Sequence, residues 1–325
     1  MSSLFIDRRG VHLELESGAI VFRENGERIG TVPLAPLTRV FLRGDVTLSA
    51  ALLGQLGERG VGVVVLSGRQ GKPSLMLARP HNDASRRVQQ IRKSLEPEFC
   101  LGLARQLIES KITRQIEWFE QQRDQNLDAR YELSHAMRLL QQQRERLPQA
   151  QSLATLRGME GSAAASYFDG LKALVPPSLH FQSRNRRPPK DPFNALLSLS
   201  YTLAHAEIAI ALYGAGLDPY VGFYHALDYG RESLASDLLE PIRPMLDRHC
   251  LQLVRQQTLS KEHFSSTESG CMMGKAGRVR YYQAYEQNSA ALRSAIAAEV
   301  EQLAEQLGCT ITAPSGADET DPSSP

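Results

Sequence analysis

Cysteine is scarce in this sequence, and two common nucleotide-binding motifs are missing from it. The four cysteines of the 325-residue chain are widely spaced and form no CxxC pair, so a zinc site or a disulfide framework is not expected and a reducing cytoplasm is the plain expectation. The chain has no P-loop and no GxGxxG motif, so nucleotide binding has no support. Its histidines show no HxxE, HExxH or HxH spacing, which disfavours a zinc hydrolase.

Long uncharged apolar runs and a large net charge are also lacking. The first residues, MSSLFIDRRG, have no apolar segment of the kind found in signal peptides. The most apolar window, Ala195 to Leu217, contains His205 and Glu207, so we expect a buried core helix and no membrane partner. The formal net charge is only +1, and without the acidic end of the chain the remainder is mildly basic, which permits nucleic-acid binding without arguing for it.

Two kinds of pattern divide the chain, whose length already favours two domains. Residues 1–80 contain short β-rich runs separated by turn signals such as the Asn-Gly pair at 25–26, which predicts a small β-sheet domain with one short helix. Residues 81–312 carry apolar residues at helical spacing and predict an all-α domain. Residues 313–325 are acidic on a Pro/Ser/Gly background and predict a disordered tail. The expected fold class is therefore α+β multidomain, a small N-terminal β domain followed by a larger all-α domain.

Residues 216–244, GLDPYVGFYHALDYGRESLASDLLEPIRP, contain the strongest candidate site. His225 follows a turn rich in glycine and aromatic residues, and Asp237 and Glu240 lie three residues apart, on one face of a helix. Two carboxylates and an imidazole suit a hard divalent cation such as Mg²⁺ or Mn²⁺, which would need at least one further ligand. Taken singly, the same residues have plainer interpretations, namely a packed histidine and a solvated helix face.

Two further stretches carry residues suited to this chemistry. Glu160 stands between Gly158 and Gly161, where small residues permit close approach of a helix or a phosphodiester backbone, although such a Glu is commonly a helix-end or turn residue. A basic cluster follows in a segment that two prolines keep extended, and it suits contacts with DNA phosphates or forms a flexible surface loop. Its members are Arg184, Arg186, Arg187 and Lys190. The residues alone thus indicate an α domain with a candidate metal site.

Four motifs in a fixed order resemble a known family over the whole length of the chain. They are RGMEGSAAASYF, SRNRRPPKDPFNALLSLSYTLAHAE, GLDPYVGFYH and ESLASDLLEPIRP. In this order they are similar to the CRISPR-associated integrase-endonuclease, the first of the Cas proteins. The resemblance implies an N-terminal β domain and a larger α-helical catalytic domain. It also implies a Mg²⁺ or Mn²⁺ ion held by Glu160, His225 and Glu240, with Asp237 as a supporting acidic residue, whereas the segment 269–282 matches only loosely.

The resemblance further implies a DNA-joining activity. Short DNA fragments, the new spacers, would be inserted into the CRISPR repeat array when a 3′-hydroxyl attacks a phosphodiester bond, and water in its place gives endonuclease activity. Because His225 has to be unprotonated to bind a metal ion, we expect activity to fall as pH drops through the histidine range. The implied partners are double-stranded DNA, a second copy of the chain paired through the β domain, and the small second Cas protein.

Two other functions stay open. A metal-dependent nuclease acting on branched or damaged DNA in repair would use the same ligands with water as the nucleophile. A non-catalytic DNA-binding subunit would tolerate the loss of Glu160, His225 and Glu240. Positioning of the DNA backbone by the basic cluster is a hypothesis from composition in each case.

Overall fold

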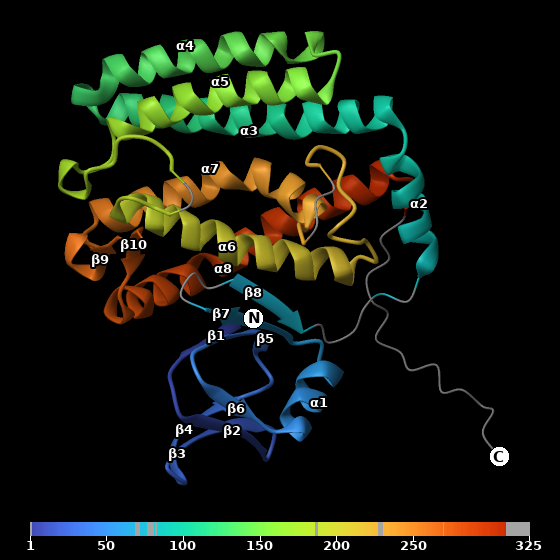
Figure 1. The fold of residues 1–325 in the computed structure, drawn as a ribbon, viewed down its shortest axis with the longest axis vertical. Helices are drawn as coiled ribbons and strands as arrows, with labels where there is room; N and C mark the ends of the chain where they lie inside the picture. Colours follow the sequence, from blue (N-terminus) through green and yellow to red (C-terminus); the bar gives the residue numbers. More distant parts are fainter. Residues whose placement is uncertain are drawn as a thin grey trace.

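The computed structural model describes residues 2–68, 72–76, 81, 83–185, 188–226, 230–268 and 270–309. The chain forms a β-rich N-terminal part and a larger, mostly helical part that follows it (Figure 1). This arrangement confirms the expected order of a small β domain and a larger helical one.

Two four-stranded sheets make up the β-rich part. Its elements are β1 (Ser2–Asp7), β2 (Val11–Glu16), β3 (Ala19–Glu24), β4 (Glu27–Pro33), β5 (Leu37–Arg43), β6 (Val46–Leu48), α1 (Ala50–Glu58), β7 (Gly62–Ser67) and β8 (Lys72–Met76). One sheet has the order β1-β5-β7-β8, in which β1, β5 and β7 are parallel and β8 is antiparallel to β7. The other sheet has the order β4-β3-β2-β6.

The hairpin between β3 and β4 has the geometry that its Asn-Gly turn predicts. Asn25 and Gly26 both have positive φ, 53° and 84°. A turn of this kind follows the right-handed twist of the two strands that it joins. Apolar side chains from both sheets and from α1 then close a small core, which includes Leu13, Ile20 and Leu52. The β-rich part therefore has a hydrophobic core of its own.

Helices α2 to α8 form the larger part. They are α2 (Ala84–Ser94), α3 (Pro97–Gln125), α4 (Arg130–Arg146), α5 (Leu153–Lys172), α6 (Pro192–Gly214), α7 (Ser233–Arg255) and α8 (Lys275–Gln306). Short 3-10 turns lie at Leu127–Ala129, Leu147–Gln149, Pro177–Leu179 and Lys261–His263. Helices α3, α4 and α5 form one layer, and α6, α7 and α8 form a second layer between it and the β-rich part (Figure 1). Because α3 contacts both α5 and α7, it joins the two layers.

The expectation of an all-α second domain needs one correction, because this part also contains a hairpin. Its strands, β9 (Phe264–Thr267) and β10 (Gly270–Met273), pair antiparallel. Gly270 has a φ of 113°, and a Cβ there would lie 2.6 Å from Cβ of Pro188. The hairpin is thus packed against the proline-containing segment that precedes α6. Strands of four residues carry too little alternation to be told from a loop by sequence alone.

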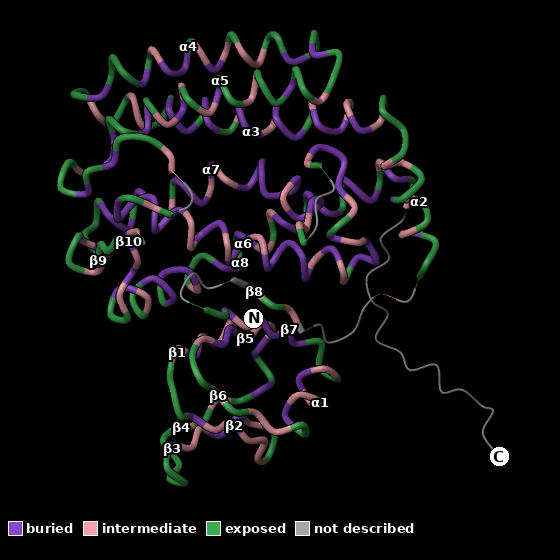
Figure 2. The backbone as a smooth tube through the Cα atoms, in the orientation of Figure 1, coloured by how far each residue is buried: buried purple, intermediate pink, exposed green. Residues whose placement is uncertain are grey.

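Helix α6 lies at the core of the helical part, as its apolar sequence predicts. By length and composition it is able to cross a membrane, but 72% of its apolar window is buried inside the protein. Buried residues are concentrated along α6 and α7, whereas the outer turns of α4 are exposed (Figure 2). This distribution is that of a helix in the core of a globular fold.

Ion pairs and close packing join the β-rich part to the second helical layer. Glu207 in α6 is buried and forms ion pairs with Arg39 of β5, at 2.9 Å, and Arg293 of α8, at 3.3 Å. Phe5 of β1 stacks on Tyr282 of α8 with ring centroids 4.5 Å apart. The β-rich part is therefore bonded directly to the core helix of the larger part.

Candidate cation and phosphodiester site

Three helices bring two carboxylates and one ammonium group to a single point. Glu160 lies in α5, Glu240 in α7 and Lys111 in α3. The Nζ of Lys111 donates to Oε1 of Glu160 at 2.6 Å and to Oε2 of Glu240 at 2.7 Å. Two carboxylates from distant segments are thus held around one cationic nitrogen. The structure therefore brings together the two glutamates that the sequence predicted for the site.

Burial makes these charges depend on one another. Lys111 is 6% exposed and Glu240 is 2% exposed. Burial by itself would lower the pKa of Lys111, but attraction by Glu240 and Glu160 outweighs it and raises that pKa. Burial would likewise raise the pKa of Glu240, but Arg243 and Lys111 outweigh it and lower that pKa. Both groups are therefore charged at neutral pH, and Arg243 is a second counter-ion, with Nε 3.0 Å from Oε1 of Glu240.

Glu160 lies inside a continuous helix and not at a turn. Helix α5 runs from Leu153 to Lys172 through both neighbouring glycines. A Cβ at Gly158 or Gly161 would meet no heavy atom within 4 Å. Glycine weakens a helix by about 1 kcal/mol relative to alanine, and here it leaves open space beside a carboxylate.

Asp237 organises the loop that carries His225. Its Oδ2 accepts hydrogen bonds from the backbone N of Phe223, at 2.7 Å, and of Tyr224, at 3.0 Å. Its Oδ1 accepts from the backbone N of His225 at 2.9 Å and lies 2.7 Å from Nδ1 of the same residue. Because an ionised carboxylate only accepts, Nδ1 carries the proton in this contact and Nε2 is left for another partner. That Nε2 lies 3.9 Å from Oε1 of Glu240.

Close packing at Gly222 allows the loop to reach Asp237. A Cβ at this position would lie 2.8 Å from the backbone C of Ser233 and 2.9 Å from Oδ2 of Asp237. Only glycine therefore fits at this point of the loop.

The spacing in the sequence predicted that Asp237 and Glu240 share one helix face, and the structure meets this expectation only in part. Glu240 faces Lys111, whereas the buried Asp237 faces the loop at 222–225.

Sequence reasoning missed Lys111, Tyr224 and Arg243. The Oη of Tyr224 donates to Oε2 of Glu160 at 2.8 Å, and burial together with this glutamate raises the pKa of the phenol, so Tyr224 keeps its proton. Tyr224 and Arg243 stand inside two of the recognised motifs, so their position in the sequence is a usable signal. Lys111 lies 49 residues from Glu160 in a long helix without a motif, and no sequence signal marks it.

Arg184, the first member of the predicted basic cluster, is held by the protein itself. Its Nη1 donates to Oδ1 of Asn194 at 2.8 Å, and its guanidinium lies 5.4 Å from the centre of the Tyr201 ring. Arg243 lies over the same ring at 4.5 Å. Tyr201 therefore contacts both this arginine and a counter-ion of Glu240.

Fewer contacts are described for the other members of the basic cluster. Lys190 is exposed, and its backbone N donates to Oδ1 of Asn185 at 2.7 Å. Arg186 and Arg187 lie outside the described residues. Contacts between this cluster and DNA phosphates stay a prediction.

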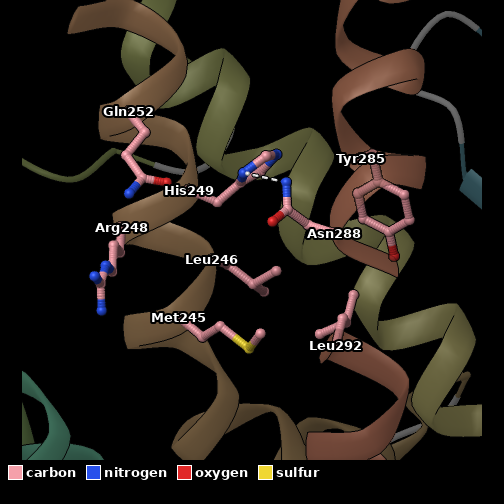
Figure 3. A pocket seen from close by; sticks show the side chains of 8 residues that line it. All are labelled: Met245, Leu246, Arg248, His249, Gln252, Tyr285, Asn288 and Leu292. Atoms are coloured by element: carbon pink, nitrogen blue, oxygen red, sulfur yellow. Dashed lines mark hydrogen bonds between the residues drawn. The ribbon is translucent and has the colours of Figure 1, made fainter. Parts of the chain in front are cut away.

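A cavity elsewhere in the helical part does not suit a hard cation. It measures about 280 Å³ and lies between α7 and α8 (Figure 3). Its lining consists of Met245, Leu246, Arg248, His249, Gln252, Tyr285, Asn288 and Leu292. Nδ2 of Asn288 lies 3.4 Å from Nδ1 of His249, and burial lowers the pKa of this histidine. Because the lining includes no carboxylate and does include the cation Arg248, it lacks the anionic oxygen ligands that favour Mg²⁺ and Mn²⁺.

The donor set around Lys111 does fit a divalent cation. Within the described part of the chain, no three acidic, histidine or cysteine side chains stand close enough to enclose an ion as they are. Two carboxylate oxygens nevertheless converge within 2.7 Å of one positively charged nitrogen. Carboxylates with a neutral imidazole are ligands that Mg²⁺ and Mn²⁺ accept. The arrangement is thus a cation site in which the ammonium group of Lys111 is the cation.

Comparisons with known proteins identify the family. The profile of the family described as CRISPR associated protein Cas1 matches residues 4–287. A protein of Thermodesulfovibrio yellowstonii, CRISPR-associated endonuclease Cas1 1, is 36% identical over 310 residues, which cover 94% of this chain and 97% of that protein. This chain therefore belongs to the Cas1 family of CRISPR-associated proteins. The recognition from four ordered motifs is confirmed, as is the expectation that the chain is an enzyme, an endonuclease of the Cas1 family.

Solved structures share the fold. A Cas1 protein from Thermotoga maritima is 22% identical and has a TM-score of 0.81, covering 98% of this chain and 100% of that one. A casposase bound to its integration product, 20% identical, has a TM-score of 0.79 and covers 94% of this chain and 91% of that one. A Cas6-RT-Cas1–Cas2 complex, 22% identical, also has a TM-score of 0.79, covering 94% of this chain and 35% of that one.

Proposed function

We propose that this chain is a divalent-metal-dependent integrase and endonuclease of CRISPR adaptation. It inserts short DNA fragments into the repeat array by attack of a 3′-hydroxyl on a phosphodiester bond. The observation that carries the proposal is the convergence of Glu160 and Glu240 on one cationic centre, with His225 beside them, in a chain of the Cas1 family.

We assign the metal ion, Mg²⁺ or Mn²⁺, to Glu160, Glu240 and His225. The two glutamates supply anionic oxygen ligands, and the contact between Asp237 and Nδ1 leaves the Nε2 of His225 with a lone pair. When bound, the ion shields the phosphate oxygens and lowers the pKa of the attacking hydroxyl group. Asp237 takes the supporting role, since both of its oxygens are engaged with the loop at 222–225.

The surrounding residues prepare the two glutamates for this task. Tyr224 holds one oxygen of Glu160 by a hydrogen bond, which limits the rotation of that carboxylate. Arg243 and Lys111 keep Glu240 ionised in spite of its burial. The glycines that flank Glu160 leave the space that a DNA backbone needs in order to approach. The site thus combines fixed anionic oxygens with an open side.

Two solved structures with this fold support DNA and the small second Cas protein as partners of this chain. The casposase that shares this fold is bound to its integration product, and another structure with this fold is a complex of Cas1 with Cas2. Double-stranded DNA and the small second Cas protein are therefore our proposed partners. A homodimer through the β-rich part, a cytoplasmic location and domain boundaries at residues 80 and 312 stay predictions, and the acidic tail at 313–325 lies outside the described residues.

A strand-transfer assay tests this function against its alternatives. The protein, its small partner and Mn²⁺ are incubated with a fragment that bears free 3′-hydroxyls and a supercoiled repeat plasmid. Joined product supports the integrase, whereas cleavage without joining supports a nuclease for branched or damaged DNA. Glu160→Gln should abolish joining, and Asp169→Asn, an exposed carboxylate on the same helix, should not. Full activity in Glu160→Gln, His225→Ala and Glu240→Gln would instead identify a non-catalytic DNA-binding subunit.

A further inference from the structure

The cation position of the site is filled by a residue of the chain. The Nζ of the buried Lys111 lies 2.6 Å from one oxygen of Glu160 and 2.7 Å from one oxygen of Glu240. Two carboxylates this close repel each other unless a cation lies between them. A Mg²⁺ ion bound by the same oxygens, at about 2.0–2.1 Å from each, needs the space that this nitrogen occupies. The ammonium group and the metal ion therefore exclude each other from the central position.

We propose that Lys111 is a built-in competitor of the divalent cation. Its ammonium group balances Glu160 and Glu240 in the metal-free protein and releases at least one of them when the ion binds. The inference rests on the proposed metal site and adds to it a residue that sets how tightly the ion is held.

The balance of charge shows why the competition is strong. Two cations, Lys111 and Arg243, already contact the carboxylates of Glu160 and Glu240, which leaves this group of four without net charge. A divalent ion that joined the group with Lys111 still in place would meet repulsion from a neighbouring ammonium at short range, where Coulomb energies are largest. Movement of Lys111 away from the carboxylates relieves that repulsion.

A second feature, independent of the carboxylates, marks where the displaced ammonium group goes. Gln115 follows Lys111 by one helical turn, on the same face of α3. The residue is 2% exposed, and its Oε1 is buried without a hydrogen-bond partner among the described residues. A buried amide oxygen without a donor is costly, and an ammonium group with three donors is able to satisfy it. Gln115 is therefore the acceptor for Lys111 when the metal ion takes its place.

Mn²⁺ binding without DNA tests the inference on the full-length chain, with the free ion measured by its electron paramagnetic resonance signal. Lys111→Met removes the competitor, so the Kd for Mn²⁺ should fall by about tenfold or more. The same variant should melt at a lower temperature in chelator, because two carboxylates lose a counter-ion. Gln115→Leu removes the receiving oxygen, so the Kd should rise several-fold while the metal-free protein keeps or gains stability. Loosened packing on α3 would not move the two affinities in opposite directions.

A matched control and a set of outcomes separate this inference from the proposed metal site. Arg39→Met breaks another ion pair, with the buried Glu207, and should leave the Kd for Mn²⁺ unchanged. A Kd in Lys111→Met equal to or above that of the wild type overturns the inference, while loss of binding in Glu160→Gln keeps the metal site standing. If Glu160→Gln binds Mn²⁺ as tightly as the wild type does, both the proposed metal site and the inference about Lys111 are overturned. If Lys111→Met does not fold, Gln115→Leu decides: a raised Kd supports the inference, and an unchanged Kd overturns it.

Discussion

Asp237 binds His225 twice, once through the backbone and once through the ring. Its Oδ1 lies 2.9 Å from the backbone N and 2.7 Å from Nδ1 of the histidine. The other oxygen accepts from the two preceding backbone N–H groups, those of Phe223 and Tyr224. One buried carboxylate therefore fixes both the path of the loop and the tautomer of the imidazole. The shape of the loop and the chemistry of the site depend on the same negative charge.

Asp237→Asn should weaken metal binding although it changes no proposed ligand. The amide keeps one accepting oxygen but replaces the other by a donor, which faces backbone N–H groups or the proton on Nδ1 of His225. We expect a loss of about 10–100-fold in Mn²⁺ affinity and a matching loss of strand transfer. Titration with Mn²⁺ checks the first and the plasmid assay the second. Asp169→Asn is the control, and wild-type affinity in Asp237→Asn would show that the imidazole needs no carboxylate to hold it.

Gly222→Ala should disturb the same loop by steric contact and not by charge. The added methyl group would lie 2.8 Å from the backbone C of Ser233 and 2.9 Å from Oδ2 of Asp237, so the loop has to move. We expect a loss of about 1–3 kcal/mol in the free energy of unfolding, together with a loss of strand transfer. Gly54→Ala in α1, where a Cβ meets nothing within 4 Å, should leave strand transfer intact. Denaturant unfolding and the plasmid assay are the measurements, and a fully active Gly222→Ala protein would refute the prediction.

Gly158→Ala should raise stability and lower activity. The position lies inside α5 with open space around it, so alanine should stabilise the helix by about 0.5–1 kcal/mol. The methyl group would stand on the exposed surface of α5 that we assign to DNA, two residues from Glu160, so DNA affinity should fall. Gly54→Ala again serves as the control, since it should stabilise α1 in the same way without an effect on DNA. A higher melting temperature with unchanged DNA affinity would show that DNA does not use this face.

Asp247 should make the stability of the fold depend on pH. It accepts hydrogen bonds from Tyr167, at 2.9 Å, and from Tyr201, but burial outweighs these contacts and raises its pKa to about 6 from 3.8. The folded protein therefore binds this proton more tightly than the unfolded chain does. A raised pKa contributes stability that is complete below the unfolded value and is lost as pH rises through the folded value. This stability should be lost between about pH 4 and about pH 7.5, most steeply below about pH 6.

Asp247→Asn removes this titration, so its stability relative to the wild type should increase across the same interval. We expect a gain of about 2–3 kcal/mol between about pH 4 and about pH 7.5. Denaturant unfolding of both proteins at several pH values gives the difference directly, and other titrating groups cancel in it. A difference that stays constant with pH would mean that Asp247 does not change its protonation in the folded protein.

The motifs located the proposed ligands, but the centre of the site came only from the fold. Glu160, His225 and Glu240 stand in stretches whose order resembles one family, so comparison with that family assigns them. Nothing in the sequence distinguishes Lys111 and Gln115 from the other polar residues of a long helix. Their meeting with the glutamates depends on how α3 packs against α5 and α7, a tertiary contact that no local pattern encodes.

Local geometry also explains a prediction that was met in part. With 3.6 residues per turn, side chains three positions apart on a helix diverge by about 60°. That angle is small enough for Asp237 and Glu240 to share a face, as predicted from their spacing. It is also large enough for one to bind the loop at 222–225 and the other to bind Lys111. Which partner each carboxylate meets is decided by the neighbouring elements.

The ion pairs of Glu207 have a consequence for DNA. Arg39 of the β-rich part and Arg293 of α8 meet on this one buried carboxylate. These ion pairs tie the β-rich part to α6 and α8, which both pack against α7, the helix that carries Glu240. If two copies pair through their β-rich parts, as the resemblance implies, the separation of their two reactive centres would be fixed before DNA arrives. The protein would then measure a set length along the repeat, so the stagger between the two joining events would be a property of the fold.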